Sequence, residues 1–304
     1  MVRIKNMGLV LMLGCLTAVM VSGHENAWGW GKEGHEIVAI IAADNLSQNA
    51  RKHVARILKV PANNKSVATA MAAAAILPDT KFKTSNPETK PWHFIDICLQ
   101  DKQTDLPARC PDKTCVVAKI DEDITRLRDG HPDHFGAKGD LAFLIHFVGD
   151  IHQPLHAATN ADRGGNCVKV VSHPPSTELH DTWDRVLVQQ VAHGLDTGNV
   201  KATAGKLEDK FGAEKAAFAW KPDGTADIAW ESTEIARKDI YIALQIPEEE
   251  CKPDLTSCTL APPAVGHLSI TLSPAELNRE SDIAARQLAK AGYRLASLLN
   301  TIWP

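Results

Sequence analysis

The chain has 304 residues, of which 44% are hydrophobic, and this length is enough for one large domain or two modest ones with a substantial core. Its 33 lysines and arginines are outnumbered by 37 aspartates and glutamates, which leaves a formal net charge of −4. This balance argues against a protein that binds nucleic acid by neutralising many phosphates with its own side chains. It leaves open an enzyme that reaches phosphates through bound metal cations, because the charge of a metal is absent from the sequence.

The first 29 residues have the pattern of a secretory signal peptide. A basic start precedes an apolar run from Met7 to Val21, and polar and small residues follow. The run is short for a membrane span, and no later stretch is long and apolar enough to cross a bilayer. We therefore expect a cleaved signal peptide over residues 1–29 and a secreted or periplasmic protein.

Two cleavage sites compete in this segment. Ala27-Trp28-Gly29 has small residues at the −3 and −1 positions and would release Trp30 as the first residue. A second sequence at residues 13–15 weakly resembles a lipoprotein site, but cleavage there would fall inside the apolar run. We expect cleavage before Trp30, so that residues 30–304 form the mature chain.

The mature chain is expected to be mainly α-helical, because its apolar residues recur at helical spacing and few runs alternate with period two. In chain order, the expected helices cover residues 37–46, 50–58, 67–77, 116–128, 140–151, 179–193, 226–244 and 274–299. The last helix begins after Ser273, with Pro274 at its first position and Glu276 behind it, which is typical of a capped start. Loops rich in Gly and Pro are expected at residues 61–65, 84–91, 101–114, 160–176 and 247–266. We see neither an internal repeat nor a clear linker.

Six cysteines remain when residues 1–29 are removed. An even number in an exported chain indicates disulfides. Cys251 and Cys258 lie close together in a Pro-rich loop and form a candidate pair, whereas the other four allow several connectivities. A zinc–thiolate site is disfavoured because no C-x-x-C pair occurs.

The segment FLIHFVGDIHQPLH at residues 143–156 carries the densest chemical signal. His146 and Asp150 are four residues apart, so their side chains share one face of a helix. Both lie in an apolar run, where an unpaired carboxylate is costly unless it is hydrogen-bonded or holds a metal. His156 follows Pro154, where the chain can turn back toward the same region. One buried His is often an ordinary core residue, but the three together favour a metal site.

The segment ELHDTWD at residues 178–184 repeats this spacing with His180 and Asp184. Together with His156, these residues supply the nitrogen and carboxylate ligands that zinc prefers. Three weaker candidates are Asp79, which follows an apolar helix, His93, which lies between two aromatic residues, and His35, near the expected mature start. Alone, each of these has an ordinary structural explanation.

The order of these motifs resembles the S1/P1 nuclease family. They are W-G-x-x-G-H at the mature start, then Asp79, W-H-F-I-D at 92–96, H-F-x-G-D-x-H-Q-P-L-H at 146–156 and L-H-x-x-W-D at 179–184. Members are zinc-dependent single-strand nucleases that also act as 3′-nucleotidases, and their fold is related to that of zinc phospholipase C. The resemblance implies an all-α, phospholipase C/P1 nuclease-like single domain with few or no strands and three zinc ions.

Carried over to this chain, the resemblance implies three ligand sets. They are Asp79, His93, His146 and Asp150 at one zinc; His156, His180 and Asp184 at a second; and His35, Asp150 and the amino nitrogen and carbonyl oxygen of Trp30 at the third. The Trp30 amine exists only after signal cleavage, so processing would complete the site. An α-amine must be neutral to bind metal, and the nearby cations favour that form.

The resemblance also implies the chemistry. Asp79 and Asp150 would be the catalytic carboxylates, water activated between two close zinc ions would attack phosphorus, and the remaining zinc would stabilise charge on the departing 3′ oxygen. The products would be 5′-phosphorylated fragments of single-stranded DNA and RNA. 3′-nucleotides would be further substrates, and the enzyme is expected to act as a monomer.

Substrate contacts follow from the same comparison. Phe94 would stack on a base and Asp96 would hydrogen-bond its edge, which favours single strands because the base must be unstacked. The family often has a cation three residues after the Asp79 position. Here that residue is Phe82, with Lys81 and Lys83 on either side, and either lysine could contact phosphate.

Two alternatives remain open from the sequence. A zinc phospholipase C uses similar ligands, although the W-H-F-I-D segment, with its base-stacking aromatic residue and base-reading Asp, favours a nuclease. A non-enzymatic metal-binding domain with a degenerate site would bind zinc without turnover, but all nine expected ligand residues are present.

Overall fold

The computed structural model describes residues 30–171, 177–222, 224–250, 252 and 255–304. The expected signal peptide and Cys251 lie outside these residues. Within the part of the chain that is described, no helix has the length and apolar character needed to cross a membrane.

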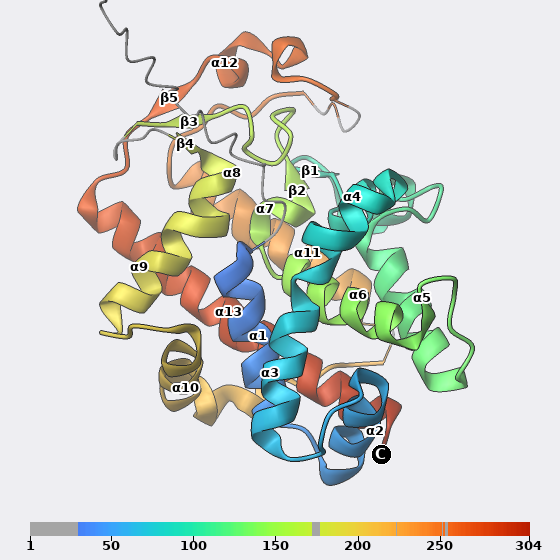
Figure 1. The fold of residues 1–304 in the computed structure, drawn as a ribbon. Helices are drawn as coiled ribbons and strands as arrows, with labels where there is room; N and C mark the ends of the chain where they lie inside the picture. The colour runs from blue at the N-terminus through green and yellow to red at the C-terminus, as the bar shows by residue number, and fades with distance from the viewer. Residues whose placement is uncertain (1–29, 172–176, 223, 251, 253–254) are drawn as a thin grey trace, which may run out of the picture.

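Helices make up most of the described chain, which confirms the all-α class expected from the apolar spacing (Figure 1). The α-helices are α1 (Lys32–Asp44), α2 (Gln48–Leu58), α3 (Asn64–Ala75), α4 (Lys83–Ser85), α5 (Val116–Asp129), α6 (Gly136–Asp150), α7 (Pro154–Ala157), α8 (Leu179–Asp181), α9 (Leu187–Gly194), α10 (Val200–Phe211), α11 (Thr225–Ile235), α12 (Pro263–Gly266) and α13 (Pro274–Ile302). The capping box expected at Ser273 is present, because its side chain accepts from the Glu276 N–H and the Glu276 carboxylate accepts from the Ser273 N–H.

Tighter and wider helical turns connect these helices. The 3-10 helices are η2 (Pro87–His93), η3 (Gln103–Arg109), η5 (Gly212–Phe218) and η7 (Cys258–Leu260), and the π-helical turns are η1 (Pro78–Phe82), η4 (Thr182–Val186) and η6 (Ala236–Ile242). Residues 84–91, expected as a loop, are therefore partly helical, since prolines are compatible with the first turn of a 3-10 helix. The expected helix 179–193 consists of α8, η4 and α9 in succession.

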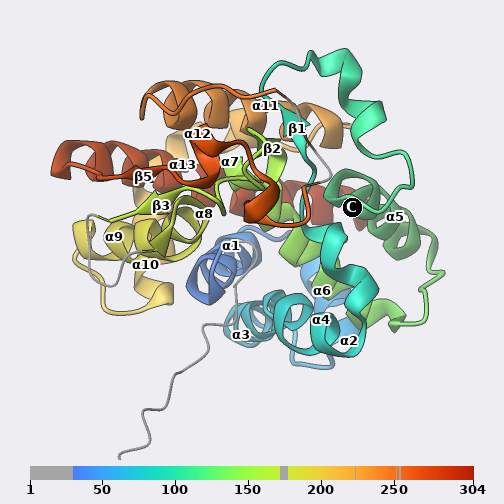
Figure 2. The same ribbon diagram turned by 90° about the horizontal axis from the view of Figure 1, so that it is seen from above.

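The strands of the described chain are short, and Ile97, Ala158 and Val170 in them are buried in the core. β1 (Ile97–Cys98) pairs in parallel with β2 (Ala158–Thr159), which fixes the segment after His93 against the segment after His156. The other strands are β3 (Lys169–Val170), β4 (Thr177–Glu178) and β5 (Ser269–Ile270), in the order β4-β3-β5. Figures 1 and 2 show this second sheet and α12 lying together beside α8.

Two helices that are buried almost all round form the centre of the core. α1 lies against α3, α6, α10 and α13 (Figure 1). In α6, every residue from Gly139 to Asp150 is buried. The crossing of α1 and α13 is close, because a Cβ at Gly292 would lie 2.6 Å from Ile41. Polar side chains on α1 and α6 are thereby held away from water, on rigid elements.

The disulfides differ from the expected pairing. Cys258 is bonded to Cys167, ninety-one residues earlier, so the expected Cys251–Cys258 pair is wrong. Cys110 is bonded to Cys115, and Cys98 is also disulfide-bonded. Closeness in sequence is a poor guide here, because the fold places η7 beside the segment that carries Cys167.

Candidate metal centre

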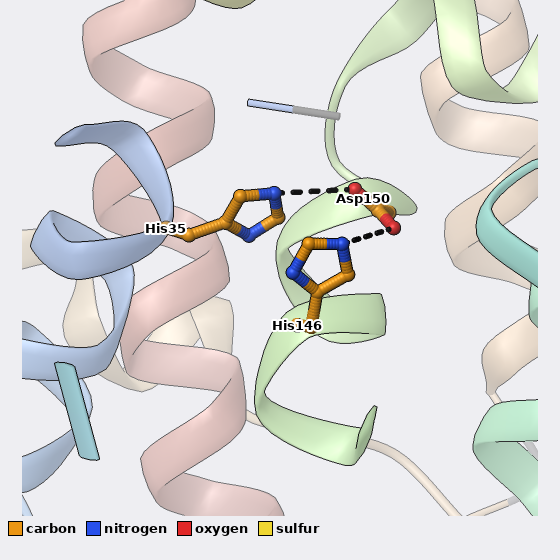
Figure 3. A group of neighbouring side chains, drawn as sticks. All are labelled: His35, His146 and Asp150. Carbon is orange, nitrogen blue, oxygen red and sulfur yellow. Dashed lines mark ion pairs between the residues drawn. The ribbon is translucent and has the colours of Figure 1, made fainter. Parts of the chain in front are cut away.

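The C-terminal turn of α6 presents His146 and Asp150 on one face, as their spacing predicts. His146 Nε2 lies 3.2 Å from Asp150 Oδ2, and both side chains are fully buried. His35 on α1 reaches the other carboxylate oxygen, with Nε2 at 3.4 Å from Asp150 Oδ1 (Figure 3). The His35 ring also stacks on His146, with ring centroids 3.8 Å apart. Asp150 therefore lies between two histidines from two different helices.

Gly149 and Trp30 lie against His35 and explain how its ring comes so close to Asp150. A Cβ at Gly149 would lie only 2.8 Å from His35 Nδ1, so any larger residue would displace the ring. The Trp30 side chain is fully buried beside Gly34, where a Cβ would lie 2.7 Å from Trp30 Cβ. The structure thus places the first residue of the expected mature chain next to His35.

Asp79 and His93 come from two further helical turns. Asp79 lies in η1, where its Oδ1 is 3.7 Å from His93 Nδ1 and its Oδ2 is 3.7 Å from His146 Nε2. His93 ends η2 and places Nδ1 3.0 Å from His146 Nε2 and 3.0 Å from Asp150 Oδ2. The two weak sequence candidates therefore join the His146–Asp150 pair.

His156, His180 and Asp184 form a neighbouring group. His156 on α7 and His180 on α8 approach with their Nε2 atoms 3.1 Å apart. His180 Nε2 lies 3.3 Å from Asp184 Oδ2, and His156 Nε2 lies 4.0 Å from Asp184 Oδ1. Asp184 lies in η4, so two of the three aspartates are in π-helical turns, which occur often at functional sites.

The protons on three histidines can be assigned from their backbone partners. Each Nδ1–H donates to a carbonyl oxygen: His146 to Ala75 at 2.7 Å, His156 to His93 at 2.9 Å and His180 to Gly164 at 2.6 Å. Because a carbonyl can only accept, each Nε2 carries a lone pair. The lone pairs of His156 and His180 consequently face each other at 3.1 Å, an arrangement that a cation between them would make favourable.

The donor set fits a metal ion. Ligand atoms on a tetrahedral ion lie about 3.3 Å apart when each is about 2.0–2.1 Å from the metal, which matches the spacings described above. Three groups could each hold one ion, with all ligand atoms of a group within 4.8 Å of one another. They are His35, His146 and Asp150; Asp79, His93 and His146; and His156, His180 and Asp184.

Buried polar atoms without a hydrogen-bond partner support this interpretation. Among the described residues they include both ring nitrogens of His35, Nε2 of His93 and one carboxylate oxygen each of Asp79, Asp150 and Asp184. Buried polar groups are almost always paired in native proteins. Bound cations would satisfy the carboxylates and would coordinate His35, whose ring nitrogens make no hydrogen bond.

Burial shifts the ionisation of these groups. It lowers the pKa of every histidine in the three groups, that of His180 to about 4. It raises the pKa of Asp79 to about 6 and holds the pKa values of Asp150 and Asp184 well above the ordinary range. The imidazoles are therefore neutral, which is the form that binds metal. The carboxylates, by contrast, are costly to ionise without a nearby positive charge.

The structure separates the two candidate lysines. Lys83 Nζ lies 3.8 Å from Asp79 Oδ1, with its side chain largely buried, and its charge acts on His93, His146 and Asp150. Lys81 is exposed, and its ammonium lies 6.0 Å from the Phe82 ring. Only Lys83 is therefore directed toward the metal groups.

Phe94 and Asp96 follow η2 directly and are both half-buried. The Phe94 carbonyl accepts from the Val116 N–H at 3.1 Å, and the Ile95 N–H donates to the His156 carbonyl at 2.8 Å. The segment that was expected to bind a base is thereby attached to the backbone of a metal-group residue.

Sequence reasoning missed several residues that support this centre. Gln153 Nε2 donates to Asp184 Oδ1 at 2.7 Å, while the Gln153 carbonyl side-chain oxygen accepts from the Leu155 N–H. Gln153 was visible inside the motif at 143–156, but its partner lies 31 residues away. Gly149 and Gly164 act through close approach, and a Cβ at Gly164 would lie 2.3 Å from the Leu155 carbonyl oxygen. No local pattern marks such contacts.

The chain is similar to known proteins over most of its length. The family model described as S1/P1 Nuclease matches residues 30–304. The chain is 28% identical to nuclease S1 of Aspergillus oryzae over 291 residues, covering 94% of this chain and 96% of that protein. It is 27% identical to endonuclease 2 of Arabidopsis thaliana over 307 residues (97% and 98%), and 25% identical to nuclease P1 of Penicillium citrinum over 282 residues (90% and 97%).

Proposed function

Because the chain belongs to the S1/P1 nuclease family, and is therefore an enzyme that cleaves phosphodiester bonds in nucleic acids, we propose that it is a zinc-dependent endonuclease of single-stranded DNA and RNA. Its products carry 5′-phosphate ends, and it also hydrolyses 3′-nucleotides. The observation that carries this proposal is the set of three His–Asp groups, which lie side by side within the region that matches the family.

The choice of zinc follows from the donor atoms. Each group offers imidazole nitrogen together with carboxylate oxygen, a combination typical of catalytic zinc sites. When bound, three such ions supply Lewis-acid activation of water and neutralise charge on the phosphodiester. The ligands are Asp79, His93, His146, His35, Asp150, His156, His180, Asp184 and the terminal amine and carbonyl of Trp30.

The side chains prepare the site for this chemistry. The two oxygens of Asp150 face His35 and His146 separately, so this carboxylate could contribute to two cation sites. Asp79 is the one carboxylate of the centre with measurable exposure, since its side chain is 18% accessible. It therefore marks the side from which a phosphodiester enters. Lys83, beside Asp79, adds a positive charge where the phosphate would lie.

Preference for single strands is proposed from the W-H-F-I-D segment. Phe94 provides a ring on which one unstacked base can stack, and Asp96 can accept hydrogen bonds from its edge. A duplex base pair would have to open before either contact formed. Lys81, which is exposed in η1, is assigned only a general attraction for phosphate.

The mature enzyme is proposed to begin at Trp30 and to be exported as a monomer. The match to the family model begins at this residue, and Trp30 is buried beside His35. The disulfides of the described chain are typical of proteins that fold in an oxidising compartment.

Product analysis by mass spectrometry tests the function. A single-stranded oligonucleotide is digested with protein that begins at Trp30 and with protein that has one extra residue before Trp30, with phosphatidylcholine as a parallel substrate. We expect 5′-phosphorylated fragments from the first protein, little cleavage by the second and no lipid hydrolysis. Equal cleavage by both proteins would refute the terminal-amine ligand. Lipid hydrolysis without nucleic-acid cleavage would replace the proposal with a phospholipase.

A further inference from the structure

His180 owes its orientation to one carbonyl oxygen in an unusual turn. The turn spans residues 160–165, and four of its residues have positive φ angles: Ala161 (54°), Arg163 (58°), Gly164 (59°) and Gly165 (82°). Alanine and arginine rarely adopt this left-handed conformation, and it persists only where the surroundings over-determine it. The Gly164 carbonyl at this turn accepts the Nδ1–H of His180 at 2.6 Å.

Several of the hydrogen bonds that hold this turn are accepted by Asp162. Its side chain is fully buried, and its Oδ1 accepts from the Asn160 N–H at 3.1 Å. Its carboxylate also accepts from the backbone of Gly165, and its carbonyl accepts from the Cys167 N–H at 3.0 Å. One carboxylate therefore connects both ends of the turn that contains Gly164.

Tyr241, which lies on a different helical turn, donates a hydrogen bond to this carboxylate. The Tyr241 hydroxyl, on η6, lies 3.0 Å from both oxygens of Asp162, and the Tyr241 side chain is 1% exposed. Burial and the adjacent carboxylate hold the pKa of Tyr241 well above its ordinary value, so the phenol keeps its proton and donates. Without this donor, part of the Asp162 charge would be buried without a partner, which strongly disfavours the turn.

We propose that Tyr241 is a positioning residue for the metal ion held by His156, His180 and Asp184, and that it acts through Asp162 and the Gly164 carbonyl. The proposal rests on the proposed metal site, because it assigns to Tyr241 the task of keeping His180 Nε2 directed at His156 and Asp184. Groups that orient a metal-ligating histidine typically change metal affinity when they are removed. Tyr241 is remote in sequence and touches none of the ligands itself.

Tyr241→Phe in the mature chain 30–304 tests this role, with Tyr293→Phe as the matched control. These are the two tyrosines of the chain, and the Tyr293 hydroxyl donates to the Glu208 carbonyl at 3.4 Å, away from the metal groups. The measurements are zinc bound per chain by mass spectrometry and the rate of zinc transfer to a chelator. We expect Tyr241→Phe to lose one zinc about tenfold faster than the wild type, with excess zinc restoring occupancy, and Tyr293→Phe to behave as wild type.

Two outcomes would overturn the inference. Wild-type zinc content and transfer rate in Tyr241→Phe, even with a lower melting temperature, would show that the hydroxyl only stabilises the fold. His180→Ala serves as the reference for the affected site: if its zinc content equals that of the wild type, the metal site itself is wrong, and the inference fails with it. Should Tyr241→Phe not fold, Tyr241→Phe/Asp162→Asn removes the unpaired charge together with the donor. Faster loss of one zinc is still expected, because this variant also lacks the hydrogen bonds that hold the turn against η6, and a wild-type transfer rate would overturn the inference.

Discussion

The backbone N–H of Gly31 donates a hydrogen bond to the carbonyl oxygen of Asp184 at 2.7 Å. A Cβ at Gly31 would lie 3.0 Å from the same oxygen, so the two segments are in direct contact. The second residue of the expected mature chain is thereby attached to the backbone of Asp184, a member of one candidate metal group, while Trp30 lies beside His35 of another. Residues 30 and 31, at the expected start of the mature chain, therefore link two of the candidate metal groups.

Trp30→Ala should lower the free energy of unfolding by about 3–5 kcal/mol, the usual cost of emptying a large aromatic site. Trp30 is fully buried, and its ring centroid lies 6.5 Å from that of Trp183. The substitution keeps the terminal amine and carbonyl, so zinc content in the folded variant should be unchanged. Urea denaturation measures the first effect. Trp220→Ala, at a half-buried tryptophan, is the control and should lower the free energy of unfolding by less. A decrease below about 1 kcal/mol for Trp30→Ala would contradict the packing described.

Gly149→Ala should lower activity at least a hundredfold and remove one zinc, because the new methyl group would lie 2.8 Å from His35 Nδ1 and force the ring away from Asp150. Zinc content and steady-state kinetics on a single-stranded oligonucleotide report the two effects. Gly205→Ala is the control, since a Cβ there has nothing within 4 Å. It should be neutral or stabilise α10 by up to ~1 kcal/mol. Full zinc content in Gly149→Ala would show that His35 does not bind metal.

Lys83→Ala should slow single-strand cleavage by roughly tenfold to a hundredfold, because it removes a largely buried positive charge 3.8 Å from Asp79, at the place proposed for the phosphate. Lys81→Ala should change the rate less than twofold, since Lys81 is exposed. Lys83→Arg, which keeps the charge, should recover part of the rate. Equal effects of the two alanine substitutions on kcat/KM would contradict the distinction between these lysines.

Glu280 provides a test of pH dependence away from the metal groups. Its buried carboxyl has a pKa raised to about 7 from 4.5, chiefly by burial. Between pH 4.5 and pH 7 the native state therefore binds more protons than the unfolded state. The contribution of Glu280 to the free energy of unfolding consequently falls as the pH rises through this range, and it stays low above pH 7. Glu280→Gln removes this pH dependence. Its free energy of unfolding, compared with that of the wild type, should therefore rise by on the order of 2–3 kcal/mol when the pH is raised from 5 to 8.

Denaturation curves at both pH values measure this difference. The exposed Glu250, changed to Gln, is the control and should shift stability by less than ~0.5 kcal/mol at either pH. A Glu280→Gln variant whose advantage over wild type is the same at pH 5 and pH 8 would show that Glu280 ionises normally in the folded protein.

Local spacing by itself determined much of this protein. Four-residue separations brought His146 to Asp150 and His180 to Asp184, because such residues are neighbours on any helix. The start of α13 was predictable for the same reason, since a capping box is complete within four residues. The family motifs placed all of the expected ligands in one region of the chain, and the structure brings their side chains together.

Tertiary packing alone decided how these pieces meet. Sequence could not distinguish Lys81 from Lys83, because the direction of each depends on the π-helical turn η1 and on the helices around it. The pairing of Cys167 with Cys258 joins segments that no spacing rule connects. Likewise, Tyr241 reaches Asp162 across 79 residues. Contacts within a helix follow from its repeat, whereas contacts between distant segments depend on the packing of the whole core. The orientation of the candidate metal ligands depends on contacts of the second kind.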